Sequence, residues 1–238
     1  LYSAGIIMER RSNVTIKNME IKGFDSQGIV LIYSSNNSIS SVKITENYGY
    51  GIYLSDSHHN KILGNNITAN RWSGILFGYC LDNSIIENQL TNNSNGIAFD
   101  ASSNNRIFGN NITANVYNGI RLHFHSDNNS ISGNNITNNP QGCFIQESSN
   151  NSIYHNNFIN NTLQIHDPSW AYPEIISPSV NVWDDGYPSG GNHWSNYNGT
   201  DLYSGPYQNE TGSDGIGDTP YIIHTNNTDR YPFMKIYY

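Results

Sequence analysis

The sequence is poor in charge, in sulfur and in long apolar runs. Only 13% of its 238 residues are charged, and the formal net charge is -8. This acidic balance argues against nucleic acid or an anionic membrane surface as a partner. No segment resembles a signal peptide or a membrane span, and no organic cofactor is expected. Because the chain also lacks an initiator Met, we interpret it as a mature chain or a portion of a longer protein.

The most prominent feature of the sequence is a short repeat. The dipeptide Gly-Ile recurs every 22 or 23 residues and returns once as Gly-Cys, with its glycines at Gly5, Gly28, Gly51, Gly74, Gly96, Gly119 and Gly142. A period of this length is typical of a solenoid. Each unit is too short to bury an apolar face alone, so neighbouring units must stack. The two cysteines, Cys80 and Cys143, lie about three units apart in different columns, and no disulfide between them is expected.

Each unit contains three short apolar segments. They alternate with polar residues and are separated by Asn, Ser or Gly, which is the pattern of half-buried strands bounded by turns. Helices are excluded because the segments are too short. The sequence therefore predicts an all-β fold, a right-handed parallel β-helix over residues 1–165, with three strands per rung and about seven rungs spaced by roughly 4.8 Å.

Asparagine is unusually abundant, with 39 residues, and most of it follows the repeat. At a turn, Asn tolerates a left-handed backbone and bonds the local main chain, while its amide can pair with the same amide one rung above and below. We therefore predict structural ladders rather than ligand sites. The ladder residues are Asn60, Asn83, Asn105 and Asn129 in one column and Asn65, Asn88, Asn110 and Asn134 in a second.

The repeat ends near Ile165. Residues 166–180 form a proline-rich connector that cannot continue a central strand. Residues 181–238 contain Trp183, Trp194 and many Tyr, Gly and Asp residues. This segment is marginal as an independent domain, so we expect a capping block that covers the last rung.

The C-terminal block carries distinctive motifs. They are Trp183-Asp184-Asp185-Gly186, Gly191-Asn192-His193-Trp194-Ser195, Asp214-Gly215-Ile216-Gly217-Asp218-Thr219-Pro220-Tyr221 and Asp229-Arg230-Tyr231-Pro232. Together with the Asn-rich repeat, they resemble the NosD-like β-helix proteins that are numerous in archaeal surface proteomes. The resemblance implies an extracytoplasmic protein. The founding member assists copper-site assembly in nitrous oxide reductase, and relatives are described as binding or hydrolysing carbohydrate.

Copper sites need convergent His, Cys or Met ligands, and few are available here. The only local histidine clusters are His58-His59 and the pair His123 and His125, which we interpret as surface turn residues. Calcium takes oxygen ligands held by tight glycine turns. Asp201, Asp214 and Asp218 offer that chemistry, so we predict a structural calcium site, with simple Asp-Gly turns as the alternative.

A polysaccharide-cleaving site on this fold would need two or three titratable groups on adjacent rungs. The best line is Asp100, His123 and Gln146, which lacks a second acid, and we therefore expect the chain not to be an enzyme. A glycan-binding protein should instead present a row of aromatic side chains. Tyr48, Trp72 and Tyr117 lie near the same turn on different rungs and keep that alternative open.

The function that we predict is an extracellular or cell-surface structural or adhesive module. Its alternatives are a carbohydrate-binding or carbohydrate-cleaving protein and, less favoured, a copper accessory protein. The expected partners are other copies joined head to tail, or adjacent surface domains, through Ile6, Ile7, Trp183, Trp194 and Tyr221. Residues 1–22 would then be buried against a neighbour. The Asn-x-Ser/Thr motifs that we consider for glycosylation are at Asn66, Asn111, Asn135, Asn198, Asn209 and Asn226.

Overall fold

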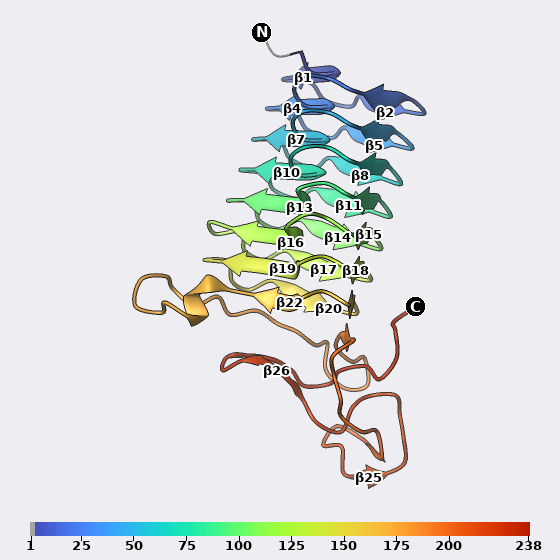
Figure 1. Ribbon diagram of the computed structural model, residues 1–238, viewed down its shortest axis with the longest axis vertical. Coiled ribbons are helices and arrows are strands. Elements are labelled where there is room, and N and C mark those ends of the chain that lie inside the picture. The colour runs from blue at the N-terminus through green and yellow to red at the C-terminus, as the bar shows by residue number, and fades with distance from the viewer. Residues whose placement is uncertain (1–2) are drawn as a thin grey trace.

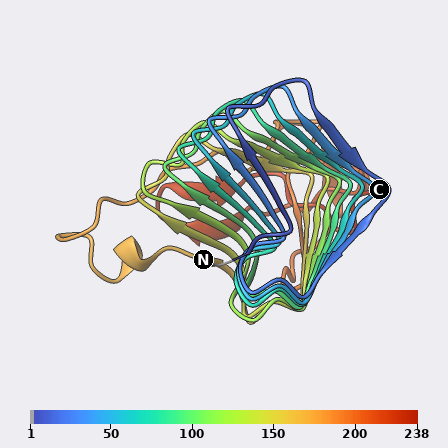
Figure 2. The same ribbon diagram turned by 90° about the horizontal axis from the view of Figure 1, so that it is seen from above.

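A computed structural model describes residues 3–238. It is a parallel β-helix with a C-terminal block below the last rung, as Figure 1 shows. Three parallel sheets run the length of the coil, with eight, seven and eight strands. Viewed along the coil in Figure 2, the rungs superimpose, and the connector projects to one side. The predicted all-β fold, with its stacked rungs, is confirmed.

The first sheet contains the longest strands. These are β1 (Ile6–Glu9), β4 (Ile29–Ile32), β7 (Ile52–Ser55), β10 (Ile75–Gly78), β13 (Asn95–Asp100), β16 (Asn118–His123), β19 (Gln141–Gln146) and β22 (Leu163–His166). The second sheet consists of β2 (Thr15–Lys17), β5 (Ser38–Ser40), β8 (Lys61–Leu63), β11 (Ser84–Ile86), β14 (Arg106–Phe108), β17 (Ser130–Ser132) and β20 (Ser152–Tyr154).

The third sheet reaches into the C-terminal block. It consists of β3 (Glu20–Lys22), β6 (Lys43–Thr45), β9 (Asn66–Thr68), β12 (Gln89–Thr91), β15 (Asn111–Thr113), β18 (Asn135–Thr137), β21 (Asn157–Ile159) and β23 (His193–Trp194). The remaining elements are a short 3-10 helix η1 (Pro168–Trp170) and two hairpins, β24 (Tyr203–Ser204) with β25 (Glu210–Thr211) and β26 (Tyr221–His224) with β27 (Asn227–Asp229). No helix within residues 3–238 is long and apolar enough to cross a membrane.

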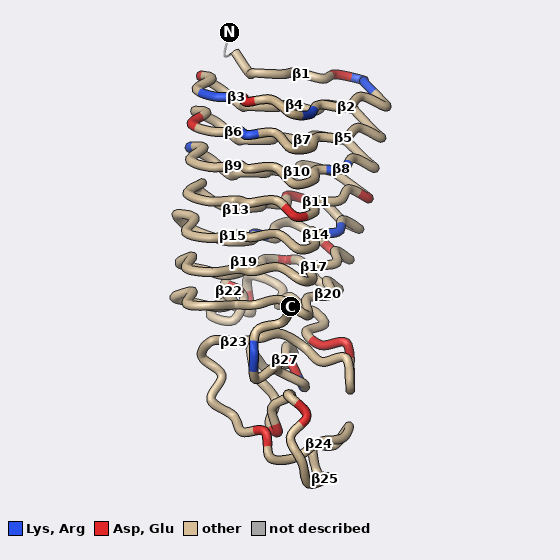
Figure 3. The backbone as a smooth tube through the Cα atoms, turned by 90° about the vertical axis from the view of Figure 1, so that its right-hand side faces the viewer, with Lys and Arg blue, Asp and Glu red and all other residues tan. Residues whose placement is uncertain are grey.

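The core consists of columns of apolar side chains that stack from rung to rung. One column is completely enclosed from Ile39 to Ile153, because each strand places its central residue inward and pairs in register with the strand below. Burying one such side chain contributes on the order of 1.5–3 kcal/mol. Charged residues are sparse along the rungs, as Figure 3 shows, and none of those in residues 3–165 is buried.

The asparagine ladders are buried and continuous. The Oδ1 of Asn110 accepts from the main-chain N–H of Asn88 and from its side-chain amide, at 2.9 and 3.0 Å. The Nδ2 of Asn110 in turn donates to Oδ1 of Asn134 at 2.9 Å and to the carbonyl of Ile85 at 3.0 Å. Asn110 is only 1% exposed. Every polar atom of this side chain therefore has a partner inside the coil.

The left-handed residue at these turns is not the ladder asparagine. It is the residue before it, such as Asn104 (φ 57°) before Asn105 or Glu87 (φ 53°) before Asn88. This corrects the sequence-based expectation. The left-handed residue bends the chain so that the asparagine that follows points its side chain inward, where it can bond along the stack.

The capping block continues the ladders beyond the repeat. Asn151 donates to Oδ1 of Asn181 at 2.9 Å, and Asn156 donates to Oδ1 of Asn192 at 3.1 Å. Below Asn192 the position is taken by Asp229, whose Oδ2 accepts from the main-chain N–H of Asn192 at 2.7 Å. The predicted cap thus repeats the hydrogen bonding of a rung with residues far apart in sequence.

Aromatic rings close the apolar interior. Trp194 stacks on Phe158 of the last third-sheet rung, with ring centroids 4.6 Å apart. Tyr221 stacks on the far side of Trp194 at 4.4 Å. Trp183 and Trp194 are each 1% exposed. The two indoles predicted for contact with another copy are therefore already enclosed by their own chain.

The other end presents Ile7, which is 62% exposed, and Ile6, which is partly buried against the core. Residues 1 and 2 of the predicted 1–22 contact lie outside the described part of the chain. Head-to-tail assembly stays a prediction, although Trp183 and Trp194 cannot supply its surface without leaving the cap.

The ladders lead to a first prediction. Replacing Asn110 by Leu should lower the free energy of unfolding by on the order of 1–3 kcal/mol, because the amides of Asn88 lose their acceptor at a buried turn. Chemical denaturation measures this loss. The matched control is Asn111→Ala, whose exposed side chain makes no bond in the structure; equal losses in both variants would contradict the ladder explanation.

The buried carboxylate of Asp229, below Asn192, leads to a second prediction. Burial raises the pKa of Asp229 from 3.8 to about 7, against hydrogen bonds from Asn192, Trp194 and Tyr231 that lower it. The folded state therefore holds a proton that the unfolded state has lost between these pH values, so the folded state should lose stability as the pH rises from about 4 to about 7. Thermal melts across this window should show the decline. Asp229→Asn should flatten it, whereas the exposed Asp185→Asn should not.

Candidate functional site

The outer face of the first sheet carries a compact polar cluster on adjacent rungs. Asp100 ends β13, His123 ends β16 and Gln146 ends β19, and the register pairs these three positions directly. Leu122 between Arg121 and His123 points into the core, so strand alternation places both Arg121 and His123 outward. The sequence analysis found the Asp100, His123 and Gln146 line, and the structure confirms that they are neighbours.

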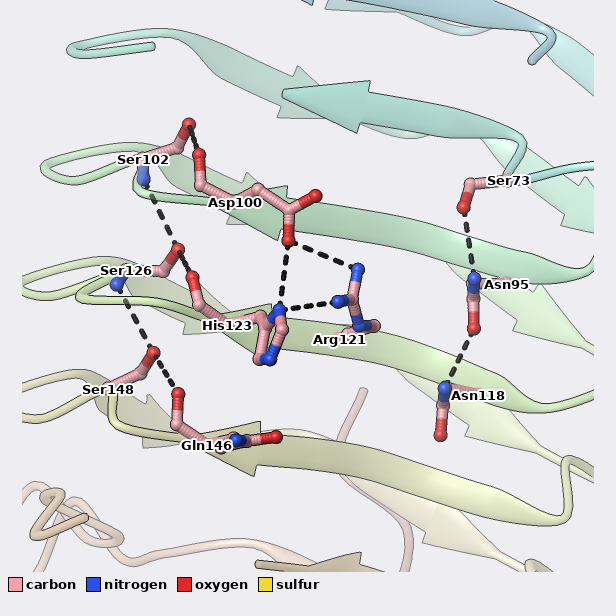
Figure 4. Close-up of polar contacts among 10 residues, drawn as sticks. All are labelled: Ser73, Asn95, Asp100, Ser102, Asn118, Arg121, His123, Ser126, Gln146 and Ser148. Carbon is pink, nitrogen blue, oxygen red and sulfur yellow. Dashed lines mark hydrogen bonds and ion pairs between the residues drawn. The ribbon is translucent and has the colours of Figure 1, made fainter. Parts of the chain in front are cut away.

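Arg121 completes the cluster, as Figure 4 shows. Its Nη1 lies 3.1 Å from Oδ1 of Asp100, and its Nη2 contacts Nδ1 of His123. Nδ1 of His123 also lies 3.3 Å from the same oxygen of Asp100. Arg121 was not predicted from the sequence, although its position two residues before His123 places it on the same face of a strand.

The histidine of the cluster is shielded. Its side chain is 13% exposed, and its ring lies 3.6 Å from that of Phe124. Burial lowers the pKa of His123 below its usual 6.5, the charge of Arg121 lowers it further, and Asp100 and Gln146 oppose the shift. The imidazole is therefore neutral at neutral pH and is able to accept a proton.

This arrangement corrects the interpretation of His123 as a surface turn residue. His123 is the last residue of β16, and both Phe124 and His125 that follow have left-handed backbones, with φ of 49° and 56°. The chain turns away there. Only His123 belongs to the cluster.

An aromatic patch lies on the N-terminal side of the cluster. Tyr50 lies 5.5 Å from Tyr53 and 4.9 Å from Trp72, measured between ring centroids. Burial raises the pKa of Tyr50, and the charge of Asp100 adds to this effect. Between patch and cluster, the outward positions are occupied by Leu76, Gly78 and Ala98, all of which are buried. The face thus combines aromatic rings and ionisable groups along the coil.

The acidic loops of the C-terminal block are arranged as hydrogen-bonded turns. Asp201 accepts from the hydroxyl of Ser213 at 2.6 Å and from the N–H of Gly215 at 2.9 Å. Asp218 accepts from the N–H groups of Leu202 and Tyr203 at 2.9 and 3.0 Å. Across residues 3–238, no three His, Cys, Asp or Glu side chains are grouped as a metal site.

The candidate glycosylation residues are all exposed. Three of them lie on the outer face of the third sheet, and the others lie in the C-terminal block; they are Asn66, Asn111, Asn135, Asn198, Asn209 and Asn226. Glycosylation at these positions stays a prediction.

Residues 2–96 and 70–199 match the model of the family described as periplasmic copper-binding protein (NosD). The chain belongs to the NosD family. Copper ligands, however, do not converge in its described part. Cys80 and Cys143 are free and buried, and burial raises the pKa of Cys80 to about 12, which disfavours the thiolate that binds metal. Since no set of metal-binding side chains is grouped there either, these residues do not fit a copper site.

Solved structures with the same fold include enzymes. The periplasmic alginate epimerase AlgG (T265N T268M double mutant) is 25% identical with a TM-score of 0.61, over 64% of this chain and 38% of that chain. The mannuronan C-5 epimerase AlgE6 A-module of Azotobacter vinelandii is 18% identical with a TM-score of 0.59, over 68% and 51%. DFA-IIIase of Arthrobacter chlorophenolicus A6 without its lid is 15% identical with a TM-score of 0.65, over 78% and 51%.

The chain thus spans less than two thirds of each of these structures. A comparison with curated proteins finds no match. The expectation that the chain is not an enzyme is wrong on these comparisons, because the solved structures that share its coil are enzymes. This likeness lies at the level of the fold.

Calcium binding by Asp201, Asp214 and Asp218 stays a prediction. If the loops take calcium, chelation should lower the melting temperature, because an ion bound only by the folded state stabilises it. The double variant Asp214→Ala, Asp218→Ala should remove this sensitivity. Identical melting curves in chelator and in millimolar calcium would leave only the hydrogen-bonded turns.

Proposed function

We propose that the protein is an extracytoplasmic carbohydrate-active β-helix protein that acts on an acidic polysaccharide at the cluster of Asp100, Arg121 and His123. The observation that carries this proposal is the contact of a neutral, shielded imidazole with an ion pair on an outward β-helix face. The extracytoplasmic location is supported by the family description and by the periplasmic epimerase of similar fold.

The composition of the cluster favours proton abstraction over hydrolysis. Glycoside hydrolysis uses a pair of carboxylates across the scissile bond, and this cluster has one, Asp100. A neutral histidine beside a guanidinium suits a different step. Arg121 would pair with the carboxylate of a uronic sugar, and His123 would take the proton from the carbon next to that carboxylate.

The electron balance of this step is simple. The C–H bond breaks, an N–H bond forms on the imidazole, and the electron pair of the C–H bond moves into the sugar carboxylate, where Arg121 stabilises the added charge. A proton delivered from water to the opposite face of the carbon, with His123 losing its proton to solvent afterwards, would give an epimer. Departure of the glycosidic oxygen instead would give chain cleavage by elimination.

Asp100 has a positioning role in this scheme. Without substrate, Arg121 donates toward Nδ1 of His123 and also contacts Asp100. A substrate carboxylate would compete for the guanidinium. Asp100 could then accept the Nδ1–H of His123, which leaves Nε2 free as the base. The carboxylate that fixes the tautomer thus prepares the imidazole for proton transfer.

The aromatic patch would supply the additional contacts that a polymeric substrate needs. A polymer needs contacts on either side of the reacting unit, and Tyr50, Tyr53 and Trp72 offer aromatic rings on the N-terminal side of the cluster. A structural role at a cell surface, with head-to-tail contacts between copies, is compatible with this activity and stays a prediction.

The proposal predicts deuterium incorporation from heavy water at C-5 of mannuronate oligomers, followed by NMR. His123→Gln and Asp100→Asn should each reduce the rate at least about a hundredfold, the usual contribution of a general base or more. His125→Gln is the matched control, since that histidine lies two residues away and outside the cluster. The rate should rise with pH to a plateau, and the midpoint of the rise should lie below pH 6.5, because the pKa of His123 is lowered.

Three results would overturn this function. They are a wild-type chain that exchanges no proton in mannuronate or galacturonate oligomers, a His123→Gln variant that keeps its rate, and equal losses in His123→Gln and His125→Gln.

A further inference from the structure

A concave pocket lies at the turn that leads into the first sheet, apart from the polar cluster. Its volume is about 330 Å³, and it is lined by Asp25, Ser26, Gln27, Tyr48, Gly49 and Trp72. These residues come from turns of successive rungs, which main-chain bonds join. The N–H of Gly49 donates to Ser26 at 2.9 Å, and that of Trp72 donates to Gly49 at 3.1 Å.

Two aromatic side chains of the pocket are supported on one side and open on the other. The guanidinium of Arg71 lies over the ring of Tyr48, 4.0 Å from its centroid, yet Tyr48 is 57% exposed. The ring of Trp72 packs at an angle of 66° on Tyr50, yet Trp72 is 47% exposed. Each ring is therefore held in place while it keeps apolar surface available for a ligand.

Gly49 lets the turns that form the pocket pack closely. A Cβ at this position would lie 3.0 Å from the main-chain carbon of Ser26 and 3.2 Å from the main-chain nitrogen of Gln27, so an added side chain would press on the neighbouring turn that lines the pocket.

The charges around the pocket restrict the ligand. Asp25 lines it and repels an anion, while Arg71 on the ring of Tyr48 repels a cation. A neutral ligand is therefore favoured. The remaining lining combines aromatic faces with the polar groups of Ser26 and Gln27, which suits a molecule with an apolar face and a rim of hydroxyl groups.

We propose that this pocket is a binding site for a neutral sugar ring, stacked on Trp72 and Tyr48 with its hydroxyl groups directed to Asp25 and Gln27. The site is separate from the cluster of Asp100, Arg121 and His123. It would hold the protein on an uncharged glycan independently of any reaction on an acidic one.

The test is titration of the full chain with neutral tetrasaccharides of glucose, mannose and N-acetylglucosamine, followed by calorimetry and tryptophan fluorescence. At least one should bind and change the fluorescence. Trp72→Ala and Tyr48→Ala should each weaken binding about tenfold, and Trp72→Phe should retain most of it because the ring remains. Tyr117→Ala is the matched control, since Tyr117 is 62% exposed near the same turn but lines no part of the pocket.

The site is refuted if no neutral tetrasaccharide binds, if Trp72→Ala binds as the wild type does, or if Tyr117→Ala loses as much affinity. Competition by choline, or tighter Trp72-dependent binding of mannuronate oligomers, would refute the neutral ligand. Deuterium exchange by the Tyr48→Ala variant separates the two proposals, because Tyr48 lines this pocket but does not belong to the aromatic patch beside the cluster. If this variant exchanges deuterium at the wild-type rate but no longer binds the neutral glycan, the neutral-sugar site is supported, whatever the result for His123→Gln.

Discussion

The structure depends on one constraint, which is that a buried amide must have partners both above and below. Each ladder asparagine accepts from the rung before and donates to the rung after, as Asn110 does between Asn88 and Asn134. An unpaired amide at such a position would cost on the order of 1–3 kcal/mol. The rungs must therefore stay in register, because a rung that slipped would leave its amides unpaired together with those of its neighbours.

The strict register of the rungs also determines which side chains meet on the outer face. Since equivalent residues align from rung to rung, side chains about 23 residues apart in sequence meet with the spacing of neighbouring strands. Asp100, His123 and Gln146 are brought together in this way, and Arg121 joins them by strand alternation. The interior amides thus hold the outer polar cluster in place without contacting it.

The sequence predicts the repetitive part of this molecule well because periodicity alone determines it. Apolar and asparagine columns in phase predict both the coil and the residues inside it. The Asp100, His123 and Gln146 line is predictable for the same reason. Arg121 was missed because adjacent rungs carry Ala98 and Phe144 in its column, so no repeat marks it.

The C-terminal block resists prediction because its contacts are not periodic. Asn181 and Asn192 continue two ladders at sequence separations of 30 and 36 residues, and no fixed spacing reveals them. The aromatic content led to the prediction of a capping block. It could not show that Trp183 and Trp194 lie beneath the last rung and are fully covered by their own chain, because that depends on how the loops fold back.

One ladder ends on a carboxylate rather than on another amide. An asparagine side chain both accepts and donates hydrogen bonds, so each ladder asparagine joins the rung before it to the rung after it. Asp229 occupies the position below Asn192, where its Oδ2 accepts from the main-chain N–H of Asn192 and from the indole N–H of Trp194. This one side chain thus fastens the end of the ladder to the aromatic ring that closes the apolar interior, so its loss would loosen the polar and the apolar parts of the cap together.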